Sequence, residues 1–152
     1  MIGEAFVFDG VAHPFNFEEG NAYGVPGQMF SNHLYAFHTV LTPPGLPLMS
    51  AEEFLHKWSV EEIREMVYNN SDTDMLVAMP LPLTDLYRDG LSPWTECAKL
   101  AQRDPDRTVM WGTVNPLEGK AALDDVTRQV EEYGAKAFKF YNVRYEDGGQ
   151  VP

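Results

Sequence analysis

The sequence predicts an α/β fold that is built from successive parallel strand–helix units. Three observations lead to this prediction: four short apolar runs, helical patterns between them, and a loop signal after each run. The runs are nearly continuous in hydrophobicity rather than alternating, which is typical of parallel strands covered on both faces. Because strands that alternate with helices pair through right-handed crossovers, we expect four neighbouring parallel strands in sequence order.

The four predicted strands are defined by their apolar content and by the turn residues that follow them. They lie near residues 5–11, 74–79, 108–114 and 136–141. The turn residues that follow are His13-Pro14, Met79-Pro80, Asn115-Pro116 and Asn142. Each run therefore has the length of an ordinary buried strand.

Capping residues predict where the helices begin. Ser59 with Glu62, and Ser50 with Glu53, have the spacing of a capping box, in which serine and glutamate each bond to the other's backbone N–H. Ser92 followed by Pro93 predicts a third helix start, because proline is well tolerated at the first helical position.

The clearest helical pattern runs from about Glu118 to Tyr133. Its apolar residues recur at helical spacing and form an apolar stripe; they are Leu123, Val126, Val130 and Tyr133. Gly134 follows as the expected end of this helix.

Two segments do not fit a complete domain of this kind. Residues 14–49 are rich in Gly, Pro, Asn and aromatics, and we expect a long loop insertion there. Residues 144–152 are turn-like, so the fourth strand lacks a covering helix. A stand-alone flavodoxin-like sheet is a weaker alternative, because this last helix and a phosphate-binding loop are both missing.

Composition and charge exclude several classes of function. The chain has 152 residues, of which 44% are hydrophobic, and a formal net charge of −12. Such a surface repels phosphate backbones and anionic lipid, so we expect neither nucleic acid nor membranes as partners. Cys97 is the one cysteine, which rules out an intramolecular disulfide. With no signal peptide or long apolar run, a cytoplasmic location is the expectation.

The first predicted strand ends in residues that can carry chemistry. Asp9 and His13 are an even number of residues apart, so on a regular strand they share one face. An imidazole at this position can bind a divalent metal, which makes bound water more acidic. A structural role for both residues is the alternative.

The segment resembles the first strand of the amidohydrolase superfamily, in particular the amidohydrolase-2 group that includes aminocarboxymuconate-semialdehyde decarboxylase-like enzymes. That group usually opens with Asp-x-His-x-His, and here Val11 stands at the first histidine position. One branch opens with Asp-x-Val-x-His-x-Tyr/Phe-Asn, which His13-Pro14-Phe15-Asn16 matches closely. Two further segments resemble the family less specifically. Residues 112–116 resemble its third strand end, and residues 134–139 resemble its fourth strand.

The resemblance implies a TIM-type (β/α)8 barrel about twice as long as this chain, of which residues 1–152 form the N-terminal half. It also implies a divalent metal, zinc by expectation, with His13 and Asp9 among its ligands. The implied function is a metal-dependent hydrolase or decarboxylase acting on a small carboxylated or cyclic substrate. The alternative is a catalytically inactive half-barrel fragment or a binding module. A homo-oligomer of this chain is compatible with either function.

Further polar residues are candidates for binding the substrate. His33 and His38 lie in the expected loop insertion, for which packing roles are the main alternative, and Lys139 lies in the fourth strand with an electrostatic or structural role. The remaining candidates are asparagines at or after strand ends: Asn16, Asn115 and Asn142.

Overall fold

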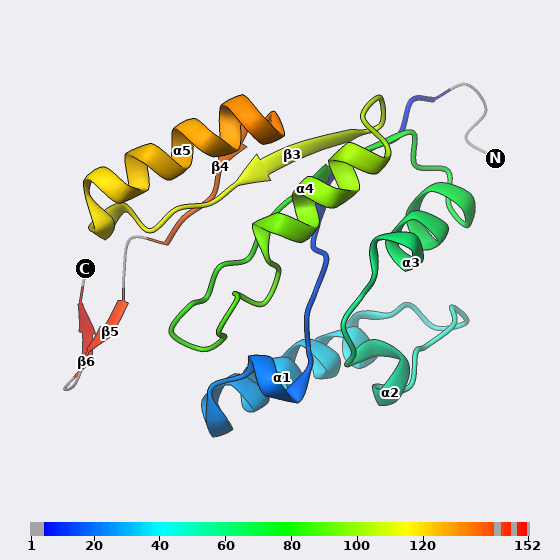
Figure 1. The fold of residues 1–152 in the computed structure, drawn as a ribbon. Helices are drawn as coiled ribbons and strands as arrows, with labels where there is room; N and C mark the ends of the chain where they lie inside the picture. The colour runs from blue at the N-terminus through cyan, green and yellow to red at the C-terminus, as the bar shows by residue number, and fades with distance from the viewer. Residues whose placement is uncertain (1–4, 142–143, 147–148, 152) are drawn as a thin grey trace.

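The structure is a computed structural model of the chain, and it describes residues 5–141, 144–146 and 149–151. Its centre is a four-stranded sheet in the order β1-β2-β3-β4, in which every neighbouring pair is parallel (Figure 1). The strands are β1 (Phe8–Ala12), β2 (Met75–Ala78), β3 (Thr108–Gly112) and β4 (Ala137–Phe138). The prediction of four adjacent parallel strands in sequence order is therefore confirmed.

The strand order also decides against the flavodoxin-like alternative. A flavodoxin-like sheet has its strands in the order 2-1-3-4-5, whereas the order here follows the chain without a switch. Residues 144–152, which the sequence analysis describes as turn-like, contain two short strands. These strands, β5 (Arg144–Glu146) and β6 (Gly149–Val151), form an antiparallel pair.

Both predicted capping boxes are present. Ser50 opens α2 (Ala51–Phe54) and accepts from the backbone N–H of Glu53, whose carboxylate accepts from the Ser50 backbone. Ser59 and Glu62 make the same exchange at α3 (Val60–Arg64), which continues as the π-helical turn η2 (Glu65–Asn69). These local exchanges need only four consecutive residues, which is why sequence spacing alone predicts them.

The third helix begins one residue later than its capping pattern suggested. The first helical residue of α4 (Trp94–Arg103) is Trp94, and Pro93 occupies the capping position. Ser92 does not cap the helix, because its buried hydroxyl donates instead to the carbonyl oxygen of Met79 at 3.2 Å. The serine thus ties the start of α4 to the end of β2.

The last helix, α5 (Lys120–Tyr133), ends as predicted at Gly134, whose φ is 75°. Its apolar stripe is divided between solvent and core: Leu123 is 68% exposed and Val130 is 45% exposed, whereas Tyr133 packs against the main core. The face of α5 that meets the sheet carries Ala122 and Gln129. The Gln129 side chain accepts from the Thr113 N–H at 3.1 Å and donates to the Thr113 carbonyl at 2.8 Å.

The segment that we expected to be a loop insertion at 14–49 contains an ordered helix. After the short turn η1 (Glu19–Asn21), α1 (Gly24–Leu41) extends for 18 residues. Its fully buried positions are small, Gly27 and Ser31, and Phe30 and Leu34 pack partly buried against the neighbouring core. A Cβ at Gly27 would lie 2.6 Å from the Leu86 carbonyl oxygen, so the helix backbone sits directly on the segment after β2.

Buried side chains join α1 to this second segment. The Tyr87 hydroxyl, on a side chain that is 1% exposed, donates to the Gly27 carbonyl at 2.7 Å and lies 2.8 Å from the Ser31 hydroxyl. Phe17, Leu81 and Leu91 complete this smaller core. In Figure 1, α1 and α2 lie together at one end of the molecule, away from α5.

A buried asparagine adds side-chain bonds between the two segments that follow β1 and β2, which backbone hydrogen bonds also join. Asn21 is 4% exposed, and its amide nitrogen donates to the carbonyls of Asn16 and Gly90, both at 3.0 Å. Its amide oxygen accepts from the Asp89 N–H at 3.1 Å. The Asn21 side chain is thus bonded to backbone on both sides of the contact.

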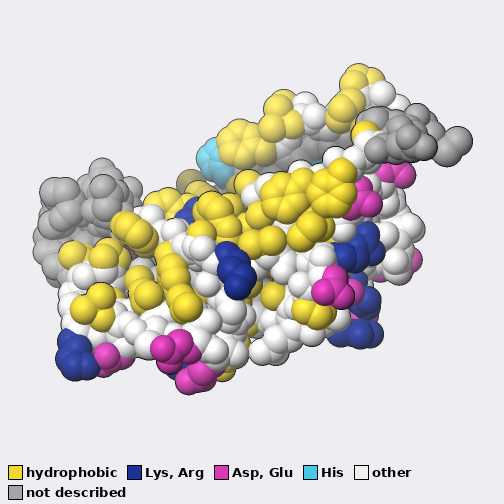
Figure 2. Space-filling view, turned by 90° about the horizontal axis from the view of Figure 1, so that it is seen from above, with side chains coloured by type: hydrophobic (Ala, Val, Ile, Leu, Met, Phe, Trp, Pro, Cys, Tyr) yellow, Lys and Arg dark blue, Asp and Glu magenta, His cyan; other side chains and the backbone are white. Residues whose placement is uncertain are grey.

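The two faces of the sheet are covered unequally. Leu76, Met110 and Ala78 belong to the main core with residues of α3 and α4, and α5 covers the Gly112 end of β3. Side chains alternate along a strand, so Val109 and Trp111 lie on the opposite face, where both are only half-buried. Figure 2 shows hydrophobic side chains gathered in a broad band across the view from above.

The Gln129 contact generates a test of the packing of α5. Replacing Gln129 with Ala leaves the Thr113 N–H and carbonyl without their partners, at a cost of ~1–3 kcal/mol for each buried group. We expect Gln129→Ala to lower the free energy of unfolding by about 2–4 kcal/mol in urea denaturation. Gln102→Ala on the exposed side of α4 is the matched control, with an expected change within ~0.5 kcal/mol. Equal effects of the two substitutions would contradict this account.

Candidate functional site

The carboxyl ends of the four strands place several polar groups at one edge of the sheet. Because all four strands are parallel, residues that immediately follow them meet at this edge. His13 follows β1, Met79 follows β2, Thr113 follows β3 and Lys139 follows β4. Two of these, His13 and Lys139, were predicted from the sequence as site residues.

His13 is fixed in one tautomer by the neighbouring strand. Its Nδ1 atom lies 2.6 Å from the carbonyl oxygen of Met79. A carbonyl can only accept, so we assign the ring proton to Nδ1, which leaves a lone pair on Nε2. Phe15 packs beside the ring, with the two ring centroids 5.4 Å apart. The histidine is therefore oriented as a base or ligand through Nε2.

Burial keeps this imidazole neutral. The pKa of His13 is lowered from 6.5, chiefly because burial penalises the charged form, and the nearby Lys139 charge lowers it further. The bond to Met79 and the Asp9 charge act in the opposite direction but are outweighed. Burial also lowers the pKa of Lys139.

Asp9 does not hold the position that its spacing predicted. In the pairing with β2, Asp9 lies opposite Leu76 and Ala12 lies opposite Ala78, so β1 carries one extra residue between these points. This irregularity breaks the alternation on which a shared face for Asp9 and His13 depended. The Asp9 carboxylate accepts from the Val11 N–H at 2.9 Å, and its influence on the His13 pKa is the weakest of the four causes.

The donor set at this edge does not fit a complete metal centre. A tetrahedral zinc site takes three or four protein donors, and His13 with Asp9 provides two. Among the residues that the structure describes, no group of three or more His, Cys, Asp and Glu side chains could hold a metal ion. The third polar side chain identified at this edge, Lys139, bears a positive charge that opposes a cation.

Thr113 is a polar group that the sequence analysis missed. Its backbone is held by Gln129, and its hydroxyl is buried without a hydrogen-bond partner in the described part of the chain. Thr113 follows the buried Gly112, so it continues the row of Val109 and Trp111 on the less covered face. Threonine is common at strand ends, so the sequence does not single out Thr113. In the structure it is distinguished by the bonds between its backbone and the Gln129 side chain.

The predicted asparagines have structural roles. Asn16 is 4% exposed, and its amide oxygen accepts from the Glu18 N–H at 3.1 Å. The Asn115 amide oxygen accepts from the Leu117 N–H at 3.1 Å and caps the turn η3 (Pro116–Glu118). Both are local turn bonds of the kind that asparagine favours. Asn142 lies outside the described residues.

The two histidines of the expected loop insertion both lie on α1. His33 is exposed and packs against Phe37, with their ring centroids 5.9 Å apart. His38 accepts from the Met49 N–H at 3.1 Å and stacks on Phe54 at 4.9 Å. The contacts of His38 anchor the segment between α1 and α2, whereas the contact of His33 lies within α1.

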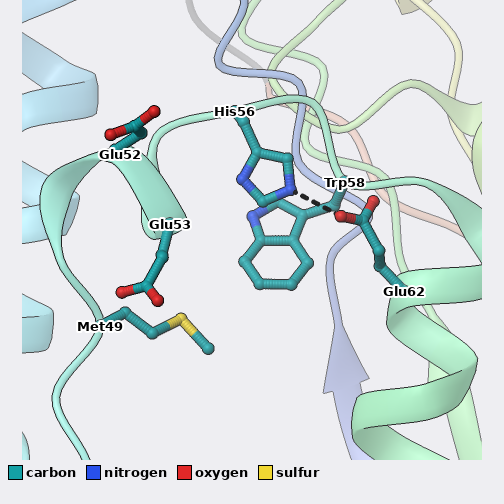
Figure 3. Close-up of a pocket in the computed structure, with 6 residues that line it drawn as sticks. All are labelled: Met49, Glu52, Glu53, His56, Trp58 and Glu62. Atoms are coloured by element: carbon teal, nitrogen blue, oxygen red, sulfur yellow. Dashed lines mark hydrogen bonds and ion pairs between the residues drawn. The ribbon is translucent and has the colours of Figure 1, made fainter.

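An open pocket lies between α2 and α3 (Figure 3), with a volume of about 430 Å³. It is lined by Met49, Glu52, Glu53, His56, Trp58 and Glu62. The acidic character of its wall has a structural explanation, because Glu53 and Glu62 are the partners in the two capping boxes. Glu62 also pairs with His56 Nε2 at 3.2 Å, as the dashed line in Figure 3 shows. Two of the three carboxylates in the wall of the pocket thus serve helix capping.

Comparison with known protein families, curated proteins and solved structures finds no match to this chain. Among the described residues, no helix has the length and apolar character that crossing a membrane requires. The functional argument therefore depends on the geometry of the sheet edge.

The lowered pKa of His13 predicts how stability changes with pH. Protonation favours the unfolded chain, where the imidazole keeps its ordinary value of 6.5, so the contribution of His13 is present above pH 6.5. It is lost as the pH falls from 6.5 towards the lower folded pKa. We expect His13→Asn to flatten this part of the stability curve in urea denaturation at pH 5 to 8.

His33→Asn is the matched control, because it also removes one imidazole but from an exposed helix position. Its curve should keep the wild-type slope between pH 5 and pH 6.5. If the His13 and His33 variants have the same slope, the buried neutral state of His13 is wrong.

Proposed function

We propose that the carboxyl edge of the sheet is part of a hydrolase- or decarboxylase-type site for a small carboxylated substrate. In this proposal Lys139 binds the substrate carboxylate and His13 acts on the substrate as a base through Nε2. The observation that carries the proposal is the bond between His13 Nδ1 and the Met79 carbonyl. It leaves Nε2 without a proton, and burial keeps the ring in that state near neutral pH.

The charge balance of the chain supports a carboxylate as the group that is bound. With 23 acidic and 11 basic residues, the protein as a whole repels anions, so an anionic substrate requires a local cation. Lys139 is half-buried at the same edge as His13, and its nitrogen lies 5.8 Å from the centre of the Tyr141 ring. Partial burial strengthens the attraction between its ammonium group and a carboxylate.

The metal remains a prediction from the family resemblance. With the imidazole and carboxylate described above, a divalent ion such as zinc needs at least one further donor from outside this set. A neutral histidine and a lysine can bind and orient a carboxylate without a metal. No chemical step of the proposal therefore depends on one.

Binding without turnover is the second candidate function, because one base and one cation are enough for recognition of a carboxylate. The single cysteine, Cys97, lies away from the site. Its side chain is fully buried in the main core, and burial raises the pKa of the thiol to about 12. A protonated, inaccessible thiol cannot act as a nucleophile.

Benzoate, a small cyclic carboxylate, provides a direct test. We expect the addition of benzoate to shift the His13 ring resonances in NMR spectra. In Lys139→Gln the affinity for benzoate should fall about tenfold, because the ion pair between Lys139 and the carboxylate is lost. Lys136→Gln removes a lysine that is exposed at the start of the same strand and should bind benzoate like the wild type. Unchanged His13 resonances, or equal affinity of both variants, would rule out the proposed site.

A further inference from the structure

A buried hydroxyl at the carboxyl edge of the sheet has no hydrogen-bond partner within the described part of the chain. The Thr113 Oγ1 atom is closed to solvent and unbonded, although the backbone N–H and carbonyl of the same residue are both bonded to Gln129. A buried hydroxyl without a partner destabilises the folded state, so such groups are few in native proteins. A role in binding explains such a group, because the ligand supplies the acceptor.

The register of the sheet places Thr113 beside Lys139. Gly112 pairs with Phe138, and the Lys139 N–H donates to the Gly112 carbonyl at 2.9 Å. The pairing therefore continues by one residue, with Thr113 opposite Lys139 on a strand about 5 Å away. Side chains alternate along a strand, and the Phe138 ring packs towards Gly112 and the main core. Thr113 and Lys139 thus share the other face.

The hydrogen-bonding groups at this edge match a carboxylate. The Lys139 ammonium only donates, the Thr113 hydroxyl has one proton to donate, and His13 Nε2 accepts. The Lys139 charge is close enough to His13 to lower the pKa of the imidazole. A carboxylate has two oxygens that only accept, so it takes one bond from each of the two donors and leaves the acceptor for another part of the substrate.

We propose that the Thr113 hydroxyl is the second group that binds the substrate carboxylate, beside the Lys139 ammonium. This inference rests on the proposed function and defines its substrate class as ionised carboxylates that are bound through both oxygens. A hydroxyl that faces water gives up a bond to water when it binds a ligand, which cancels most of the gain. The Thr113 hydroxyl is closed to water in the free chain, so a carboxylate oxygen that reaches it replaces no such bond.

The side chains that cover the hydroxyl have to move when the carboxylate binds. Lys139 is the neighbour of Thr113 in the register, and its stem is long and flexible. In this proposal the ammonium group follows the carboxylate, and the stem turns away from the hydroxyl. Thr113 itself keeps its position, because Gln129 holds its backbone N–H at 3.1 Å and its carbonyl at 2.8 Å.

Thr113→Val tests the proposal, because valine has the shape of threonine without the hydroxyl. In the free chain the thermal midpoint should rise by ~2 °C or more, since an unpaired buried hydroxyl is removed. The affinity for benzoate, measured by NMR titration, should fall about fivefold. Thr113→Ser keeps the hydroxyl and should bind benzoate within about twofold of the wild type.

Thr108→Val is the matched control on the same strand. Thr108 is 6% exposed, and its hydroxyl lies 2.8 Å from the Tyr68 hydroxyl, so this threonine has a partner within the chain. The control variant should therefore have a lower thermal midpoint than the wild type, with an unchanged affinity for benzoate.

The outcomes separate this inference from the proposed function. If Lys139→Gln weakens benzoate binding and Thr113→Val does not, the inference fails and the proposed function stands. A lower thermal midpoint in Thr113→Val would mean that the hydroxyl is bonded in the free chain, which also overturns the inference. The same result follows if Thr108→Val loses as much affinity as Thr113→Val. A wild type that does not bind benzoate would overturn both.

Discussion

The requirement that a parallel sheet be covered on both faces determines most of this structure. Nearly continuous apolar strands are destabilised by water on either face, so the helices of the strand–helix units pack against them. The chain meets this requirement on one face, where α3, α4 and α5 form the main core around Leu76 and Met110. The geometry of the site follows from the same constraint, because parallel strands bring the residues after β1, β2, β3 and β4 to one edge.

Short-range patterns made much of the fold predictable. The four strands and both capping boxes were found from runs of four to seven residues, whose physical cause lies within the run. The helix α1 and the buried face of α5 could not be found in this way. Their packing depends on contacts with distant residues, such as Gly27 against Leu86 and Gln129 against the Thr113 backbone. In both cases small or polar residues occupy the fully buried positions, and hydrophobic periodicity does not detect such residues.

The candidate site was predictable for a similar reason and to a similar extent. His13 was identified because it follows a predicted strand, and Lys139 because it lies in the predicted fourth strand of the family resemblance. The prediction that Asp9 and His13 share a face was wrong, because a single irregularity in β1 changes the alternation of its side chains. No residue pattern in the sequence predicts this irregularity. Asn16 and Asn115 have the right position for binding, but asparagine at a strand end satisfies the turn backbone just as well. The half-barrel interpretation remains a prediction, supported by the strand order and the family resemblance.

The bonds of Asn21 have a consequence for how this protein can be engineered. Its one side chain bonds to backbone before α1 and to backbone after β2, so the two segments that border the site are held as a single unit. Changing the length of either segment alone would remove partners from a buried amide, whereas transplanting both together would preserve them. Loop grafting that aims to alter ligand preference should therefore exchange the two segments together and keep Asn21, whose side chain bonds to both.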